Sequence, residues 1–264
     1  MKPLERLGEA RTPDGTVIAL YRHDGAYLIR ADGVELMSTR RHLSEDRLAE
    51  VACGPYRDVA GARVLIGGLG LGFTLRAALR SLGDDAEVVV AEFMAEVIAW
   101  NANAEYELSA EAMRDPRVRI VHDDIVNVLQ ANPGGFDAIM LDTDNGPEGM
   151  LMSESARLYA KHGIGLTMAA LRGPGPIVYW SVGDDPTFAG ALVHGGLAVT
   201  SMQVRAHETS GPMHTLYMAT PRPPKAAKAP AAATVTASKG KRDARKGRQS
   251  AHGRPRHGRR SRED

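Results

Sequence analysis

The sequence contains one cysteine and no long apolar run, and both features exclude classes of protein. A single cysteine, Cys53, cannot form an intrachain disulfide or supply the ligands of a cysteine-rich zinc site. It follows Val51 and Ala52 in a helical pattern, which predicts a buried packing residue rather than a nucleophile. No stretch reaches the ~18 apolar residues of a membrane-spanning helix, and the N-terminal sequence MKPLERLGEARTPDG lacks the apolar region of a signal peptide. We therefore expect a cytoplasmic protein that does not contact membranes.

Charge is unevenly distributed along the chain. Residues 221–264 contain 14 Lys and Arg against 3 Asp and Glu, whereas residues 1–220 contain 19 against 29. Val235 is the only large apolar residue of the basic tail. We expect this tail to be disordered, because it cannot bury enough apolar surface to offset its ordering entropy. Such a tail is typical of weak, non-specific contact with nucleic acid or another polyanion, or of a solubilising extension.

The first sixty residues predict a small β meander followed by a helix. Three β-prone runs, TVIALYR, AYLIR and VELMST, are separated by Asp-Gly pairs at 24–25 and 32–33, which favour tight turns between antiparallel strands. Ser44 is the predicted N-cap of the helix SEDRLAEVA, which Gly54 and Pro55 end.

From residue 62 to residue 220, strands and helices alternate. The predicted strands are RVLIG, EVVVAE, VRIVH, FDAIMLD and PIVYWS. The predicted helices between them are 74–81, 95–103, 124–131 and 154–171. Apolar strands connected by helices form parallel sheets that are covered on both faces. The last two strands, LAVTSMQVRA and HTLYMAT, are joined by a short connection, which predicts an antiparallel hairpin.

These patterns together predict an α/β fold. We expect a Rossmann-like, seven-stranded, mostly parallel sheet with helices on both faces. A small N-terminal antiparallel β element precedes it, and the disordered tail follows it. The predicted domain boundaries are 1–60 for the meander and its helix, 61–220 for the cofactor-binding catalytic domain, and 221–264 for the tail.

A glycine cluster follows the first strand of this predicted sheet. Gly68, Gly70 and Gly72 alternate with leucines in the first strand-to-helix turn, where open α/β sheets usually bind ligands. Glycine lets the backbone bend tightly and lets a ligand lie against it. The same glycines are also consistent with close packing of the strand against the helix alone.

Two acidic residues follow the next two strands. Glu92 ends EVVVAE, 20 residues after Gly72, where a carboxylate can accept both hydroxyls of a ribose. Asp124 follows VRIVH, where a carboxylate can accept the amino group of adenine. Together with the glycine turn, they predict a nucleoside bound across the strand ends.

The glycine spacing separates two kinds of nucleoside cofactor. A dinucleotide-binding G-x-G-x-x-G counted from Gly68 would need glycine where Phe73 stands. The G-x-G-x-G spacing, with acids after the second and third strands, is similar to class I S-adenosylmethionine-dependent transferases. The ligand of these transferases has no phosphate, so their glycine loop does not need the last glycine of the dinucleotide-binding motif. We therefore expect S-adenosylmethionine or its decarboxylated form.

Over residues 15–180 the chain resembles the spermidine synthase (polyamine aminopropyltransferase) family. The matching segments are DGVELMST, VLIGGLGLGFTLR, VVVAEFMAEVI, DPRVRIVHDD, FDAIMLDTDNGP and LYAKHGIGLTMAALRGPGPIVYW. The resemblance implies aminopropyl transfer to a small-molecule amine in polyamine biosynthesis, a small β domain beside the active site, and a homodimer.

The resemblance also assigns roles to single residues. The family's ribose-binding acid falls on Glu92, its adenine-side acid on Asp124, and its catalytic Asp on Asp142. An amine must be neutral to attack a carbon beside a sulfonium, so a carboxylate at Asp142 would act as general base. Asp144, close to the family's second Asp, is the other catalytic candidate. Alternatively, Asp142 is a cap on the turn that follows it.

Several positions depart from the family pattern. Leu71 replaces an Asp of the glycine loop, and Asn145-Gly146 replaces Asp-Pro. Glu35 occupies the position of a Gln in the family, and Leu48-Ala49 occupies that of a Tyr-His pair. A cationic polyamine would therefore find fewer of its usual side-chain partners. Leu71 also does not repel the carboxylate of ordinary S-adenosylmethionine, as an Asp would.

Two alternative functions follow from these departures. The first is methyl transfer to a small molecule, in which Asp142 and Asp144 would be oxygen ligands of Mg²⁺. That chemistry expects an Asp-Asn pair after the fifth strand, which VYWSVGDDP does not supply in register, so we expect no metal. The second is a non-catalytic nucleoside-binding protein whose tail contacts nucleic acid.

Overall fold

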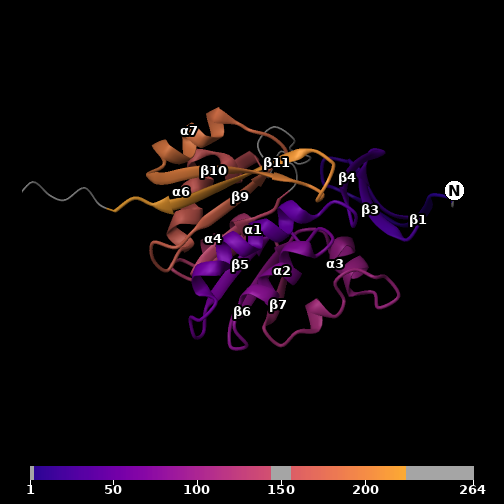
Figure 1. The fold of residues 1–264 in the computed structure, drawn as a ribbon, viewed down its shortest axis with the longest axis horizontal. Coiled ribbons are helices and arrows are strands. Elements are labelled where there is room, and N and C mark those ends of the chain that lie inside the picture. The colour runs from indigo at the N-terminus through magenta and orange to yellow at the C-terminus, as the bar shows by residue number, and fades with distance from the viewer. Residues whose placement is uncertain (1–2, 144–155, 224–264) are drawn as a thin grey trace, which may run out of the picture. The chain divides into compact units, whose positions relative to one another are not determined.

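The N-terminal residues form a four-stranded antiparallel sheet, which we call sheet A, at one end of the structure (Figure 1). The computed structural model describes residues 3–143 and 156–223. Sheet A has the strand order β1-β2-β3-β4. Its strands are β1 (Glu5–Arg11), β2 (Val17–His23), β3 (Ala26–Ala31) and β4 (Val34–Ser38).

The Asp-Gly turns of this meander form as predicted. Asp24 and Asp32 have φ angles of 47° and 45°, and the glycine after each also has positive φ. Positive φ at both central residues is the conformation of the tight turns that match the twist of a hairpin. Strand β1 was not predicted, because most of its residues are polar and exposed, so it shows little apolar alternation.

The first helix, α1 (Leu43–Cys53), begins one residue earlier than predicted. The prediction that Ser44 caps it was wrong: His42 occupies the N-cap position, with no capping bond from its side chain. Ser44 is instead fully buried, and its hydroxyl lies 2.8 Å from Nδ1 of His214. A polar contact distant in sequence therefore replaces the local cap.

The large sheet confirms the predicted fold class. Its seven strands lie in the order β10-β11-β9-β8-β5-β6-β7. They are β5 (Arg63–Gly67), β6 (Glu87–Glu92), β7 (Val118–His122), β8 (Ala138–Leu141), β9 (Ile177–Ser181), β10 (Leu197–Arg205) and β11 (Met213–Pro221). The first five are parallel, and the β10–β11 hairpin closes the sheet antiparallel to β9. Since β5 lies between β6 and β8, it marks the switch point of the sheet.

Helices cover both faces of this sheet. Besides α1, they are α2 (Phe73–Ser81), α3 (Ala95–Ala102), α4 (Ile125–Ala131), α5 (Ala156–Tyr159), α6 (Lys161–Ala170) and α7 (Pro186–His194). Two short 3₁₀ turns, Gly54–Tyr56 and Ala112–Arg114, are also present. Helix α7 was not predicted, although it begins with proline and Asp185 caps it by accepting the N–H groups of Thr187 and Phe188.

The prediction of one helix over 154–171 was wrong in the part that the structure describes. The backbone is extended at Ala160, with ψ of 165°, so α5 and α6 are separate. Gly163 of α6 lies so close to α5 that an added Cβ would be 2.3 Å from the carbonyl oxygen of Leu158. The chain bends because the two short helices pack at this glycine.

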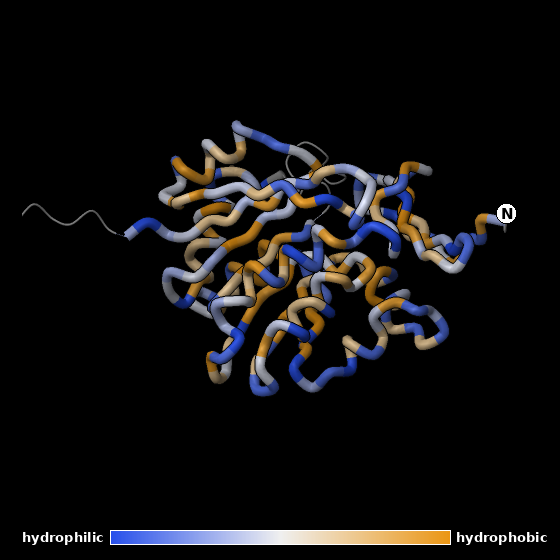
Figure 2. Tube along the Cα trace, in the orientation of Figure 1, coloured by the Kyte–Doolittle hydropathy of each residue, from blue (hydrophilic) through white to orange (hydrophobic). Residues whose placement is uncertain are grey.

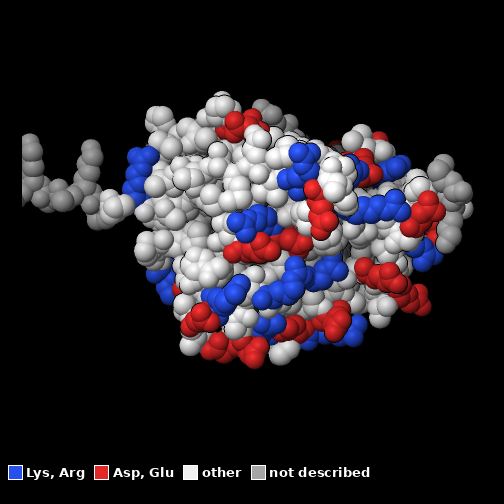
Figure 3. Space-filling model, viewed as in Figure 1, with Lys and Arg blue, Asp and Glu red and all other residues white. Residues whose placement is uncertain are grey.

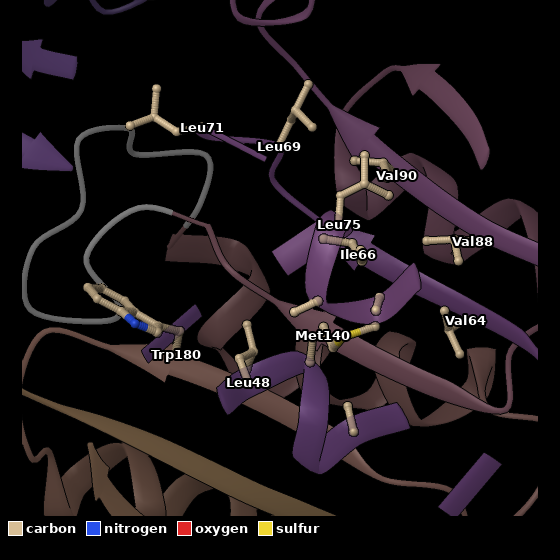
Figure 4. Close-up of a cluster of buried hydrophobic side chains, with 14 of the residues drawn as sticks. Leu48, Val64, Ile66, Leu69, Leu71, Leu75, Val88, Val90, Met140 and Trp180 are labelled. Carbon is tan, nitrogen blue, oxygen red and sulfur yellow. The ribbon is translucent and has the colours of Figure 1, made fainter. Parts of the chain in front are cut away.

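Each face of the large sheet has its own apolar core. Val64, Ile66 and Met140 pack under α1, α2 and α3, and Figure 4 shows Ile66 beside Leu75 of α2. Leu65 and Ile139, from alternate positions of the same strands, pack under α4, α6 and α7. Figure 2 shows the hydrophobic residues concentrated along these strands. The strands therefore read as continuous apolar runs because both faces are buried.

The surface shows no segregation of charge on the face drawn in Figure 3, where acidic and basic side chains are intermixed. Strand β11 extends to Pro221, and the predicted tail beyond residue 223 lies outside the described residues. Within residues 3–143 and 156–223, none of the helices is both long and apolar enough to cross a membrane. The domain boundaries stay predictions.

Candidate active site

A cavity lies between sheet A and the carboxyl ends of the parallel strands. Four apolar side chains of sheet A, Ile18, Ile29, Leu36 and Met37, line one side of it together with Thr12. The opposite side includes residues at or just after the ends of β5, β6, β7 and β8. Among them are Gly68, Gly70, Glu92, Asp124, Asp142 and Thr143. This is the place where an open α/β sheet binds its ligand.

The glycine loop is shaped first by contacts within the protein. Gly68 has φ of +93°, and an added Cβ would lie 2.3 Å from the carbonyl oxygen of Asp142. Gly72 has φ of +76°, and its Cβ would lie 2.3 Å from Cβ of Ser109. Packing therefore explains both glycines. Gly72 is the N-cap of α2 and does not line the cavity, whereas Gly68 and Gly70 do.

Gly70 carries the loop beneath sheet A. Its φ is +52°, and an added Cβ would lie 3.0 Å from Sδ and Cε of Met37. Leu71, next in the chain, is 2% exposed and belongs to the core under α1, α2 and α3. A side chain at position 71 therefore packs inward, and Leu71 does not line the cavity.

Glu92 is held by two backbone groups. Its Oε2 accepts the N–H of Leu69 at 2.9 Å, and its Oε1 accepts the N–H of Met94 at 2.8 Å. The residue is 8% exposed and lines the cavity. Because each carboxylate oxygen can accept more than one hydrogen bond, the side chain can bind the glycine loop and a ligand together.

Asp124 combines a structural role with its position in the cavity. Its Oδ1 accepts the N–H of Val126 at 2.8 Å and caps α4. The neighbouring Asp123 instead accepts from Asn127 at the protein surface. Of these two acids, Asp124 is the one that lines the cavity.

Asp142 follows the last residue of β8, next to the switch point. Its backbone N–H donates to the carbonyl oxygen of Gly67 at 2.9 Å. The hydroxyl of Thr74, in the first turn of α2, donates to its Oδ2 at 2.6 Å. The carboxylate is therefore oriented by α2 while it lines the cavity. Asp144 lies outside the described residues.

Two side chains beside Asp142 were not predicted as part of this site. Thr74 is buried and bonds its carboxylate. Glu45 of α1 is the second, since burial and the negative charge of Asp142 raise the pKa of Glu45 to about 8. The sequence places Glu45 in the first turn of a helix, but it gives no signal that this helix packs against β8.

The positions that depart from the spermidine synthase pattern have structural roles here. Glu35 pairs with Arg41 and does not line the cavity. Leu48 and Ala49 are fully buried in the core under α1. Among the described residues that line the cavity, none is Lys, Arg or His. The polar groups of the cavity are thus mainly carboxylates and backbone groups.

No protein-family model and no curated protein matches this sequence. Solved structures do match. The crystal structure of spermidine synthase from Thermotoga maritima has a TM-score of 0.63 at 18% identity, over 82% of this chain and 72% of that one. A crystal structure of spermidine synthase in complex with the transition state analogue AdoDATO has a TM-score of 0.62 at 17% identity, with the same coverage. The chain therefore has the spermidine synthase-like fold that its sequence resemblance implied.

Proposed function

We propose that this protein is a spermidine synthase-like transferase that uses decarboxylated S-adenosylmethionine or S-adenosylmethionine and transfers an aminopropyl group to a small amine. The observation that carries the proposal is the cavity at the switch point, in which Glu92, Asp124 and Asp142 face an apolar wall from sheet A. A solved structure of the same fold holds the transition state analogue AdoDATO. The amine as acceptor, a homodimer, a cytoplasmic location and contact of the tail with polyanions stay predictions.

The residues of the cavity fit a nucleoside with a sulfonium. In this proposal Glu92 accepts the ribose hydroxyls and Asp124 accepts the adenine amino group. Gly68 and Gly70 line the cavity, so in this proposal their backbone lies against the ligand. The apolar side chains of sheet A cover the adenine ring and the methylene groups. Gly72 does not line the cavity, so in this proposal it does not contact the ligand and serves only as the N-cap of α2.

Asp142 acts on the acceptor. The ammonium form of the amine gives a proton to its carboxylate, which leaves a nitrogen lone pair. That lone pair forms a bond to the carbon beside sulfur, the carbon–sulfur bond breaks, and its electrons stay on sulfur as a neutral thioether. Thr74 orients the base during this step, because its hydroxyl donates to Oδ2.

Methyl transfer is the second candidate, and Leu71 favours it. The side chain at position 71 is an apolar core residue, so the glycine loop carries no acid that would repel the carboxylate of ordinary S-adenosylmethionine. In that reaction the same cavity holds the cofactor and Asp142 faces a different acceptor. A non-catalytic nucleoside-binding protein would show binding without turnover of either kind.

The test is a side-by-side calorimetric titration of the full chain with both forms of the cofactor, followed by turnover assays. We expect the decarboxylated form to bind, and Asp142→Asn to keep that affinity and lose turnover with amines. We expect Asp124→Asn to weaken binding. The matched control is Asp123→Asn, because Asp123 is exposed and does not line the cavity. If neither form binds, the proposal fails. Binding of the ordinary form alone would instead select methyl transfer.

A further inference from the structure

Two buried polar side chains lie beside the glycine loop. Asn101, near the end of α3, is fully buried, and Ser109, in the connection between α3 and the 3₁₀ turn Ala112–Arg114, is 1% exposed. Neither side chain lines the cavity. A buried polar group is costly unless it is hydrogen-bonded, so the partners of this pair show what it does in the fold.

Asn101 bonds three groups at once. Its Nδ2 donates to the carbonyl oxygen of Gly70 at 2.8 Å and to that of Val97 at 2.9 Å. Its Oδ1 accepts the hydroxyl of Ser109 at 2.7 Å. Because carbonyl oxygens can only accept, the NH₂ must face Gly70 and Val97, and the Ser109 hydroxyl must donate. These partners therefore fix the orientation of the Asn101 amide.

The bond to Gly70 sets the direction of one peptide group in the glycine loop. Gly70 lines the cavity, whereas Asn101 does not. The Gly70 carbonyl is bonded to Asn101, so it is turned away from the space that its own residue lines. Glycine adopts many backbone conformations, so without this bond the residue itself does little to hold that direction.

The other polar groups of the loop are held from elsewhere. Leu69 donates its N–H to Oε2 of Glu92, and its carbonyl oxygen accepts the N–H of Gly72 at 2.8 Å. Gly68 donates its N–H to the carbonyl oxygen of Ala91 at 2.9 Å. Strand β6 thus holds the first half of the loop, and α3 holds Gly70 through Asn101.

Ser109 is itself fixed against the loop. An added Cβ at Gly72 would lie 2.3 Å from Cβ of Ser109, so the chain passes close to Ser109 at this glycine. The carbonyl oxygen of Ser109 accepts the N–H of Met113 at 2.8 Å. The preceding carbonyl, that of Leu108, accepts Nη1 of Arg76 in α2 at 3.1 Å. The segment that carries Ser109 is therefore attached to α2 where the glycine loop ends.

We propose, on the basis of the proposed function, that Asn101 and Ser109 are positioning residues that hold the glycine loop in the conformation that receives the cofactor. Asn101 keeps the Gly70 carbonyl out of the cavity, and Ser109 keeps the amide of Asn101 from rotating. When the pair is lost, the carbonyl can turn inward. There it takes up ligand space and adds negative partial charge to a cavity whose polar side chains are mainly carboxylates.

This role affects binding and not the chemical step. When only a fraction of the molecules has the binding conformation, the apparent dissociation constant rises by the inverse of that fraction. Asp142 is oriented by the Thr74 hydroxyl and by the carbonyl of Gly67, and neither bond involves the pair. We therefore expect loss of the pair to raise KM for the cofactor and to leave kcat unchanged.

The test compares Ser109→Ala with Ser81→Ala in the full chain. Ser81 is also nearly buried, donates to the carbonyl oxygen of Ala77 at 2.8 Å within α2, and does not line the cavity. We expect Ser109→Ala to weaken calorimetric binding of the cofactor about 10-fold, which is the effect of about one lost hydrogen bond. Ser81→Ala should keep the affinity of the unaltered protein. Unchanged affinity in Ser109→Ala, or an equal loss in both variants, would overturn the proposal.

Asn101→Leu is the second variant, in case Ser109→Ala does not fold. Leucine is similar in size to asparagine, but it cannot donate to Gly70 or accept from Ser109. We expect its affinity for the cofactor to fall at least as far as that of Ser109→Ala. A folded Asn101→Leu that binds the cofactor like the unaltered protein would also overturn the proposal.

Hydrogen exchange of the free protein separates this proposal from the proposed function. We expect the backbone N–H groups of residues 68–73 to exchange faster in Ser109→Ala than in Ser81→Ala, because the loop opens more often. Equal exchange in the two variants would show that the pair does not hold the loop. If the unaltered protein binds neither form of the cofactor, the proposed function fails, and the exchange rates still decide whether the pair holds the loop.

Discussion

The two walls of the cavity differ in how they are held. The strand-end wall, made by the glycine loop, Glu92, Asp124 and Asp142, is fixed by hydrogen bonds and close backbone contacts. The sheet A wall, made by Thr12, Ile18, Ile29, Leu36 and Met37, is mostly apolar, and its apolar side chains pack against the core under α1, α2 and α3. The first wall can therefore place individual atoms of a ligand, whereas the second can exclude water and adapt.

Gly68→Ala is expected to break the strand-end wall with the largest effect. The substitution combines an unfavourable positive φ with a Cβ 2.3 Å from the Asp142 carbonyl oxygen. We expect a loss of about 3 kcal/mol of unfolding free energy, measured by denaturant titration. Gly15→Ala is the matched control: Gly15 has φ of +95° with no atom within 4 Å, so it should lose only about 1 kcal/mol. Equal losses would mean that the contact with Asp142 is unimportant.

Glu92→Gln tests the same wall through its hydrogen bonds. Both carboxylate oxygens accept backbone N–H groups, so the amide NH₂ must face a donor. We expect a loss of about 2 kcal/mol in stability, and weaker nucleoside binding by calorimetry. Glu87→Gln, at the other end of β6 and paired with Arg63, is the control that should leave binding unchanged. Binding that is unaltered in Glu92→Gln would remove Glu92 from the site.

Gly8→Ala tests the packing that holds the sheet A wall. An added Cβ would lie 2.4 Å from Nε1 of Trp100 in α3, so β1 or the indole must move. We expect about 1–2 kcal/mol lower stability and a changed Trp emission spectrum, with the hydrogen bonds of the strand-end wall intact. A spectrum identical to that of the unaltered protein would show that this contact does not hold sheet A in place.

Met37→Ala should have the smallest effect. Met37 covers Gly70 and is partly exposed, so its truncation removes apolar contact with the ligand but few contacts in the core. We expect about 1 kcal/mol weaker cofactor binding, measured by calorimetry, and little change in Tm. A large drop in Tm would instead assign the residue to the packing of sheet A.

The same difference between the walls explains what the sequence could predict. Residues whose role follows from a neighbour in the chain were predictable: Asp24 and Asp32 form their turns, and Glu92 ends its strand as expected. Ser44 was misassigned, because its hydroxyl is bonded to a histidine 170 residues away rather than to the next turn of helix. Glu45 was missed for a similar reason, since only packing of α1 against β8 brings it near Asp142.

The separation of α5 from α6 was also beyond the sequence pattern, whereas the start of α7 is marked in the sequence by Asp185 and Pro186. Apolar residues continue through the bend at Ala160, and only the contact of Gly163 with the carbonyl of Leu158 reveals it. The site residues taken from the family resemblance stay predictions until binding is measured. Their positions at one cavity follow from the order of the strands, which the alternation of strands and helices predicted.

The chain contains two tryptophans, both in the core under α1, α2 and α3 and neither in the cavity lining. Trp100 packs against Gly8 of sheet A, whereas Trp180 lies near the carboxyl end of β9, beside His214 of β11. Each indole is nearly buried, at 8% exposure. Trp180→Phe would thus leave a fluorophore that reports on sheet A, and Trp100→Phe one that reports on the strand ends. The protein therefore carries two optical probes, one packed against sheet A and one between β9 and β11.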